Sequence, residues 1–266
     1  MRIVRTVAEV RGALEEPRRS GRRIGLVPTM GAFHDGHRAL MRAARAACDV
    51  LVVSLFVNPA QFDEAADLAR YPRDEAADAR DADAEGVDVL FVPPVTELYP
   101  PGFDTWVDPG ELAELLEGAA RPGHFRGVAT ICTKLFTIVG PDAAWFGQKD
   151  AQQVAVIRRV VVDLDLPVEI VAVPTVREPD GLAMSSRNRF LSPDQRAAAL
   201  ALPSALRAGA SAHAAGADAA DAARAVLETE SQLAVDYVAL ADFDVPTLVA
   251  AVRIGSTRLI DNVRLA

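Results

Sequence analysis

The chain of 266 residues has little cysteine, few aromatic residues and no long hydrophobic run. Its two cysteines, Cys48 and Cys132, lack the spacing of a zinc site or a redox motif, so we expect buried free thiols in a reducing compartment. No apolar run approaches the ~20 residues that span a bilayer. Charged residues interrupt the N-terminal segment too often for a signal peptide. These absences predict a soluble, cytoplasmic protein.

Positive charge is also scarce, since 28 Lys and Arg residues stand against 37 Asp and Glu residues, for a net charge of −9. Nucleic-acid binding normally needs a basic face, so the composition argues against DNA or RNA as the main partner. A small anionic substrate is still compatible, because a local cluster of charge can oppose the global sign. The length suggests one large domain or two unequal ones, with a core that needs neither disulfides nor a structural metal.

Short apolar runs alternate with amphipathic stretches over the first two thirds of the chain. The runs predict strands at residues 24–27, 50–57, 87–92, 143–146 and 168–173. The stretches between them predict helices at residues 36–48, 74–85, 127–139 and 150–163. This rhythm is typical of an α/β fold, in which helices cover both faces of a parallel sheet. Ligands bind such sheets at the carboxyl ends of the strands, where the strand order reverses.

The composition changes after about residue 175. Alanine, the strongest helix former, supplies 16 of the 29 residues from 197 to 225, and Gly209 and Gly216 punctuate that run. We interpret it as two helices; disorder is the alternative, but several leucines and valines offer anchors. The segments VDYVALAD and STRLIDNVRL predict strands. We therefore expect a first domain at residues 1–175 and a smaller α+β domain at residues 176–266.

The segment VPTMGAFHDGHRALMRAA runs from a strand through a glycine-containing turn into a helix. It places His34 and His37 at the first turn of that helix, where free backbone N–H groups and the helix dipole favour an anionic phosphate. The alternatives are a zinc pair or two incidental surface histidines. Zinc needs more ligands, and the other two histidines, His124 and His213, offer no obvious second pair.

Two further motifs follow predicted strands. In SLFVNPAQF, Asn58 and Gln61 are candidates to orient a hydroxylated or carboxylated ligand, although Asn-Pro alone is an ordinary turn signal. In WFGQKDAQQVAVI, Lys149 is a candidate partner for a phosphate. Asp150 is equally compatible with a plain helix N-cap. The amide of Gln153 lies one helical turn further on, and we expect it to face the ligand site at the carboxyl ends of the strands.

A fourth motif, PTVREPDGLAMSSRNRFLS, falls at the predicted domain boundary. Its hydroxyls, backbone N–H groups and Arg187 are suited to close over a polyphosphate. The alternative is a solvated linker that ends in a helix cap at Ser192. Met184 is expected to pack around a base or to be an ordinary core methionine.

Together with YPRDEAAD, RPGHFRGV and RLIDN, these motifs resemble the pantoate–β-alanine ligase family, in order from residue 24 to residue 263. The histidine pair resembles the HIGH motif of the nucleotidyltransferase superfamily, and MSSRN stands where that superfamily has its KMSKS loop. NPAQF and FGQKDAQQ narrow the resemblance to the ligase.

The resemblance implies a Rossmann-like nucleotide- and pantoate-binding domain, followed by a C-terminal lid. It implies the AMP-forming, ATP-dependent condensation of (R)-pantoate with β-alanine to pantothenate, in the coenzyme A pathway. The reaction would run through an enzyme-bound pantoyl adenylate and release pyrophosphate. Mg²⁺ would arrive with ATP, and the family is usually a homodimer built through the N-terminal domain.

The resemblance also implies roles for single residues. His37 would be the proton donor and His34 a phosphate contact, with Lys149 and Arg187 as further catalytic residues. Gln61 and Gln153 would hold pantoate, and Gln61 would also serve β-alanine. The ATP site would comprise Met30, Gly31, Ala32, Phe33, His34, Asp35, Gly36, His37, Gly147, Gln148, Lys149, Asp150, Val176, Met184, Ser185, Ser186 and Arg187.

Three positions depart from the family pattern. Gln148 replaces a glutamate, Ala151 replaces a tyrosine, and Ala77 precedes Asp78 where the family often has two adjacent acids. This last departure argues against a metal site built by the protein, and Asp78 is the one residue considered for a contact to Mg²⁺.

Two other functions remain as alternatives. An adenylyl- or cytidylyltransferase would stop after nucleotide transfer, which the pair of glutamines argues against. A non-catalytic nucleotide-binding homologue is disfavoured because the histidines, the lysine and the SSR sequence are all present.

Overall fold

The computed structural model describes residues 1–63 and 65–265, and the chain divides into two compact units. Unit 1 comprises Met1–Gly147 and Gln152–Val173, and unit 2 comprises Gln148–Ala151 and Pro174–Ala266. The sequence placed residues 148–151 in the first domain, whereas here they group with the C-terminal unit. None of the helices within the described ranges is both long and apolar enough to cross a membrane.

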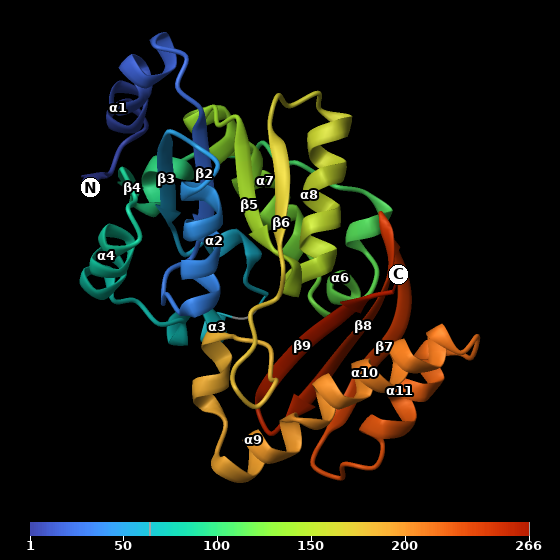
Figure 1. Ribbon diagram of the computed structural model, residues 1–266. Helices are drawn as coiled ribbons and strands as arrows, with labels where there is room; N and C mark the ends of the chain where they lie inside the picture. Colours follow the sequence, from blue (N-terminus) through green and yellow to red (C-terminus); the bar gives the residue numbers. More distant parts are fainter. Residues whose placement is uncertain (64, 266) are drawn as a thin grey trace. The chain divides into compact units, whose positions relative to one another are not determined.

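Unit 1 is built on a six-stranded parallel sheet with the strand order β1-β4-β3-β2-β5-β6 (Figure 1). Its strands are β1 (Arg2–Val4), β2 (Ile24–Thr29), β3 (Val50–Leu55), β4 (Val89–Phe91), β5 (Ala143–Gly147) and β6 (Glu169–Val173). The chain adds β3 and then β4 on one side of β2, and later places β5 and β6 on its other side. The strand order therefore reverses between β2 and β5, and the carboxyl ends of these strands are where such sheets bind ligands.

Helices cover both faces of this sheet. On one face, α2 (Asp35–Arg45) and α4 (Glu75–Ala84) pack on the sheet, and on the other lie α1 (Val7–Arg19), α7 (His124–Val139) and α8 (Ala151–Asp163). The shorter elements of the unit are η1 (Pro59–Gln61), α3 (Ala65–Arg70), α5 (Val95–Leu98), η2 (Glu111–Ala113) and α6 (Glu117–Ala120).

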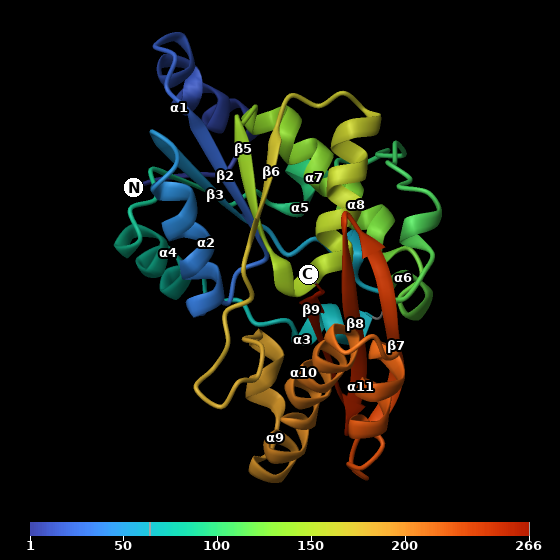
Figure 2. The ribbon, with the colours of Figure 1, turned by 45° about the vertical axis from the view of Figure 1, so that its right-hand side comes forward.

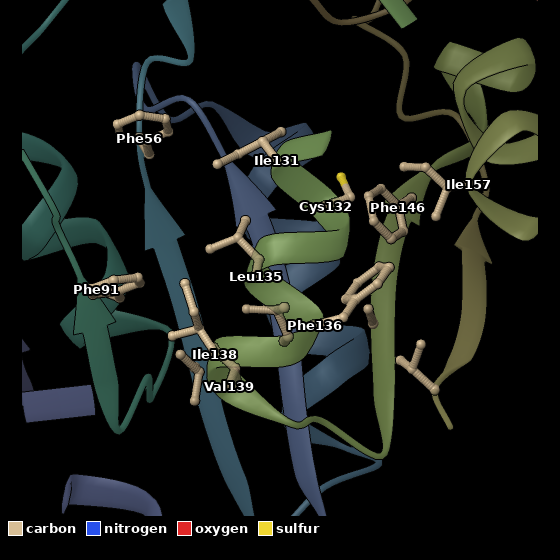
Figure 3. Close-up of a cluster of buried hydrophobic side chains, with 14 of the residues drawn as sticks. Phe56, Phe91, Ile131, Cys132, Leu135, Phe136, Ile138, Val139, Phe146 and Ile157 are labelled. Carbon is tan, nitrogen blue, oxygen red and sulfur yellow. The ribbon is translucent and has the colours of Figure 1, made fainter. Parts of the chain in front are cut away.

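The strands are apolar throughout because successive side chains enter two different cores. In β2, Leu26 packs under α7, whereas its neighbour Val27 packs under α2, and both are fully buried. Figure 3 shows the α7 side of the sheet, where Leu135 and Phe136 project from the helix toward the strands. A strand covered on both faces has no polar side, which explains the uninterrupted apolar runs in the sequence.

Unit 2 contains a three-stranded antiparallel sheet, β7 (Ala234–Phe243), β8 (Val245–Ile254) and β9 (Thr257–Arg264), with β8 in the centre. Two helices, α10 (Ala201–Ala214) and α11 (Ala219–Leu227), lie side by side against this sheet, as Figure 2 shows. The remaining elements are η3 (Gln148–Asp150), η4 (Ser186–Phe190) and α9 (Pro193–Ala199). Folded helices, and not disorder, therefore account for the alanine-rich run.

Both cysteines are free, as expected, but only Cys132 is fully buried, while Cys48 is partly exposed. Burial raises the pKa of the Cys132 thiol to about 12, so this side chain behaves as a small apolar core residue.

The α/β fold class and its parallel sheet are confirmed, and the five predicted strands are all present; β2 and β5 extend beyond the predicted ends, whereas β3, β4 and β6 are shorter than predicted. Among the described elements, the sequence interpretation missed β1, α1 and β8, together with several short helices such as α3, α5 and α6. β1 is only three residues long, and β8 follows β7 after the single residue Asp244, too closely for a separate run to stand out.

Gly209 does not break the alanine-rich run, contrary to expectation, because α10 continues through it and the chain turns at Gly216 instead. A Cβ on Gly209 would lie 2.6 Å from the carbonyl oxygen of Ala219 and 2.3 Å from Leu248. Glycine thus permits the close approach of α10 to α11 and β8.

We expect Gly209→Ala to destabilise the protein by about 1–3 kcal/mol, because the overpacking exceeds the gain in helix propensity. Gly12→Ala in α1 is the matched control, since a Cβ there has nothing within 4 Å. It should stabilise the protein by about 0.5–1 kcal/mol. Denaturant unfolding of both variants measures the difference; equal effects would show that Gly209 does not mark a packing constraint.

Candidate active site

The turn that follows β2 brings the two motif histidines together. His34 is the N-cap of α2, and its Nδ1 accepts the backbone N–H of Gly36 at 3.1 Å. The Nδ1 of His37 accepts the backbone N–H of His34 at 3.4 Å, and the two ring centroids lie 4.2 Å apart. A ring nitrogen that accepts a hydrogen bond carries no proton, so each neutral imidazole keeps its proton on Nε2. The turn thus holds two Nε2–H donors beside the positive end of a helix.

Two backbone N–H groups that precede this helix are bonded within the protein. The N–H groups of Ala32 and Phe33 donate to the carboxylate of Asp78, at 2.9 and 2.8 Å. Asp78 lies on α4, is 3% exposed, and has a pKa raised by burial. Because both N–H groups are inside the protein, an internal acceptor satisfies them.

Each of the two oxygens of Asp78, the residue considered for a magnesium contact, accepts a backbone N–H, and the side chain is 3% exposed. Its neighbour Ala77 contributes only a backbone N–H, which donates to Asp74. Over the described part of the chain, no three His, Cys, Asp or Glu side chains are grouped to hold a metal. A magnesium ion here would depend on ligands other than a protein cage, namely phosphate and water.

Gln61 lies in η1, just beyond the end of β3, and is 8% exposed. Its Oε1 accepts a hydrogen bond from Nδ2 of Asn58 at 3.0 Å. The orientation of Asn58 is fixed in turn, because its Oδ1 accepts from the Tyr99 hydroxyl at 2.9 Å and from the N–H of Ala60 at 3.3 Å. Burial raises the pKa of Tyr99, which keeps this hydroxyl protonated as a donor. The Nε2 of Gln61 is therefore the end of the amide left to donate to a ligand.

The segment RPGHFRGV holds the backbone of Gln61. The carbonyl oxygen of Gln61 bonds to Nδ1 of His124 at 2.8 Å and to the guanidinium of Arg121 at 3.2 Å. A carbonyl only accepts and a guanidinium only donates, and Arg121 also contacts Nε2 of His124 at 3.3 Å. His124 is thus neutral with its proton on Nδ1. Gly127 completes the contact, since a Cβ there would lie 2.2 Å from the carbonyl oxygen of Ala60.

The two adjacent glutamines of α8 have different surroundings. Gln152 is 4% exposed, and its amide bonds to the backbone of Glu117, Leu112 and Leu115 at 2.8–3.0 Å. Gln153 is half-buried, and its side chain has no hydrogen-bond partner within the described residues. Gln152 therefore holds the backbone of the 112–117 segment, while the amide of Gln153 can serve a ligand.

In unit 2, the side chain of Asn262 holds the backbone that carries Lys149. Its Nδ2 donates to the carbonyl oxygens of Gln148 and Lys149, at 2.9 and 2.8 Å. Lys149 itself is 20% exposed, with its Nζ 3.6 Å from Asp150. Asp150 is the last residue before α8, the position of an N-cap. The terminal RLIDN motif thus fixes η3 while the ammonium group stays accessible.

The PTVREPDGLAMSSRN motif is an ordered part of unit 2. It is not the plain solvated linker that the sequence left open as an alternative. Arg177 makes a bidentate ion pair with the buried Asp261, at 2.6 and 3.1 Å. The amide of Asn188 bonds to Glu178 at 2.6 Å and to the carbonyl oxygen of Ala183 at 3.0 Å.

This fold of the motif brings two of the predicted nucleotide contacts together. The N–H of Met184 donates to the carbonyl oxygen of Val176 at 2.9 Å, so the two residues are neighbours. Ser185 caps η4, which contains Ser186 and Arg187, and Ser192 caps α9 as the sequence suggested.

The predicted site residues are distributed over both units. In unit 1, the ends of β2 and β3 are in register at Thr29 and Leu55, so the histidine turn and the Gln61 segment begin at the same edge of the sheet. Gly147 ends β5 at the switch point, next to β2. Unit 2 contains the remaining candidates: Gln148, Lys149, Asp150, Val176, Met184, Ser185, Ser186 and Arg187.

Sequence reasoning gave no roles to Tyr99, Arg121, His124 or Asn262, which hold the candidate side chains in place. Arg121, His124 and Asn262 do lie in motifs that carry the family resemblance. The partners of these residues are backbone carbonyls and a buried amide distant in the sequence, and no local pattern predicts such contacts.

Comparison with known proteins gives one consistent result. The family model described as pantoate-beta-alanine ligase matches residues 2–264. The chain is 54% identical to pantothenate synthetase 1 of Bradyrhizobium diazoefficiens over 281 residues, covering 100% of this chain and 99% of that protein. It is 53% identical to the pantothenate synthetase of a Roseiflexus species over 276 residues, covering 98% of each.

Solved structures agree with the sequence comparison. A pantothenate synthetase from Thermus thermophilus has a TM-score of 0.93 at 45% identity, covering 100% of this chain and 99% of that one. The pantoate-beta-alanine ligase of Francisella tularensis, complexed with beta-gamma ATP and beta-alanine, has a TM-score of 0.86 at 33% identity, covering 99% and 97%. The chain belongs to the pantoate–β-alanine ligase family.

Proposed function

We infer that this protein condenses (R)-pantoate with β-alanine to form pantothenate, at the expense of ATP, which yields AMP and pyrophosphate. The observation that carries the proposal is the family match over residues 2–264, with every catalytic candidate of the family motifs present. The ATP and β-alanine of the Francisella tularensis complex are two of the substrates that the proposal requires.

The reaction proceeds in two steps. A carboxylate oxygen of pantoate attacks the α-phosphorus of ATP, the bond to pyrophosphate breaks, and a pantoyl adenylate forms. The neutral amine of β-alanine then attacks the acyl carbon, AMP leaves, and the amine loses a proton to solvent or to the departing phosphate. No covalent enzyme intermediate is needed, so catalysis rests on positioning and on stabilising charge.

The side chains divide this work according to their chemistry. His34 and His37 present Nε2–H donors to phosphate oxygens, with His37 as the proton donor, and Lys149 places a cation on the phosphates. Arg187 and the serines beside it, Ser185 and Ser186, contribute to the triphosphate site. Val176 and Met184, which are neighbours, contact the nucleotide, with Val176 at the adenine.

The acyl substrates are held by amides. The Nε2 of Gln61 donates to pantoate and serves the β-alanine site as well, and Gln153 donates to pantoate from α8. Gln61 is buried and Gln153 is half-buried, and their amide nitrogens stay available, which suits recognition of hydroxyl and carboxylate groups. Mg²⁺ would enter the site bound to ATP, with phosphate and water as its ligands.

We further propose a cytoplasmic homodimer formed through unit 1, with no nucleic acid or membrane as partner. The family resemblance supports the dimer, and the net charge of −9 disfavours nucleic acid. Unit 2 acts as the lid over the bound nucleotide.

We expect AMP and pantothenate to accumulate from MgATP and pantoate only when β-alanine is added. Without the amine, pyrophosphate release should stop near one turnover, because the adenylate stays bound. Mass spectrometry of the product and a coupled AMP assay measure both. A nucleotidyl product that accumulates without the amine would indicate a nucleotidyltransferase, and ATP binding without AMP would indicate a non-catalytic homologue.

Lys149→Ala should lower the rate of the first step by about 10²–10³, the usual effect of removing one positioned charge or donor. Asn262→Ala should lower it by about 10-fold or more, because η3 loses both hydrogen bonds that hold the lysine. Pantoate-dependent exchange of pyrophosphate into ATP isolates this step. The double variant should be no slower than Lys149→Ala; additive losses would show that Asn262 acts independently of the lysine.

Gln153→Ala should raise the KM for pantoate and leave thermal stability unchanged. Its neighbour provides the matched control: Gln152→Ala should lower stability by about 1–3 kcal/mol, since it strands buried backbone groups, yet leave the pantoate KM near its original value. Steady-state kinetics and thermal unfolding measure the two effects. An unchanged pantoate KM in Gln153→Ala would remove this residue from the site.

A further inference from the structure

The turn that precedes His34 has an unusual backbone. Gly31 and Ala32 are consecutive residues with left-handed conformations, at φ 85° and 53°. An alanine in this region is strained, so the surrounding structure must stabilise it. In such a turn, successive N–H groups point toward the same side and form a concave binding place for an anion.

The carboxylate of Asp78 fills this concave place. Its Oδ2 accepts the N–H of Ala32 at 2.9 Å, and its Oδ1 accepts the N–H of Phe33 at 2.8 Å. A Cβ on Gly31 would lie 2.7 Å from Oδ2, so only glycine allows the approach. An anion supplied by α4 thus binds the backbone N–H groups of Ala32 and Phe33, directly before the N-cap of α2.

The charges around Asp78 show that these N–H groups are its main support. Within the described ranges no cation forms an ion pair with Asp78. Arg38 of α2 pairs with Asp35 and Asp81. Burial raises the pKa of Asp78, and the acidic side chains of Asp81 and Asp74 raise it further. A buried carboxylate without a cation is costly, and it is tolerated when hydrogen bonds hold both oxygens.

We propose that Asp78 is a positioning residue of the histidine turn and not a magnesium ligand: its carboxylate holds Gly31 and Ala32 in the left-handed conformation that leads into His34, the N-cap of α2. His34 comes directly after this turn. The turn therefore positions both the imidazole ring of His34 and its backbone N–H, which donates to Nδ1 of His37. Loss of the carboxylate would leave two buried N–H groups unpaired and release the strained backbone. The consequence for catalysis rests on the proposed function.

The test compares Asp78→Asn with Asp83→Asn, an exposed position on the same helix. The asparagine keeps the size of the side chain but turns one acceptor into a donor that faces a backbone N–H. We expect pantoate-dependent pyrophosphate exchange to fall by about 10–100-fold in Asp78→Asn, with the control unchanged. The loss should be the same at every Mg²⁺ concentration.

Rescue of Asp78→Asn by excess Mg²⁺ would overturn the proposal, because it would identify a lost metal ligand. So would additive losses when Asp78→Asn is combined with His37→Ala, since a residue that acts through the histidines should add little to their removal. Unchanged exchange in the folded variant would also contradict it.

A measurement on the unmodified protein covers the case in which the variant does not fold. By NMR, the amide protons of Ala32 and Phe33 should exchange slowly with solvent in the absence of any ligand. Mn²⁺ added without nucleotide should not selectively broaden the signals of residues 31–33 and 78. Fast exchange or selective broadening would overturn the proposal. Neither amide exchange nor Mn²⁺ broadening requires an active enzyme. A protein that made no pantothenate would therefore contradict the proposed function, while these two measurements would still test the role of Asp78.

Discussion

Irregular backbone that is buried at the ends of strands must have its N–H and carbonyl groups satisfied within the protein, because water no longer reaches them. In this chain, side-chain amides and carboxylates distant in the sequence supply those partners. Asp78 serves the turn after β2, Gln152 serves the 112–117 segment, and Asn262 serves η3. The turn that leads to His34 and the segment that carries Lys149 depend on such contacts.

These contacts divide the polar residues into two kinds. Gln152 is buried and bonded at both ends of its amide, while its neighbour Gln153 is half-buried and has an amide left for a ligand. The same relation holds between the buried Asn262 and the accessible Lys149 that its contacts keep in place. Side chains that are fully bonded give rigidity, and the less bonded side chains beside them can then recognise substrate from a fixed position.

Gln61 shows how far this support extends. Asn58 orients its side-chain amide, and Arg121 and His124 hold its backbone carbonyl. The support comes from η1 itself and from the N-terminal end of α7, which Gly127 lets approach closely. The amide thus has one orientation before any ligand arrives, and less conformational entropy is lost when a carboxylate binds.

The sequence by itself determined the parallel sheet, most of its strands and the long helices between them, and the family, because apolar periodicity and short motifs are local properties. It also named His34, His37, Gln61 and Lys149 as candidates. Only the tertiary structure decided that Asp78 bonds to the turn after β2, that Gly209 packs in place of breaking a helix, and that Gln152 and Gln153 differ. Hydrogen bonds and close approaches join residues far apart in the chain, so no pattern of neighbouring residues records them.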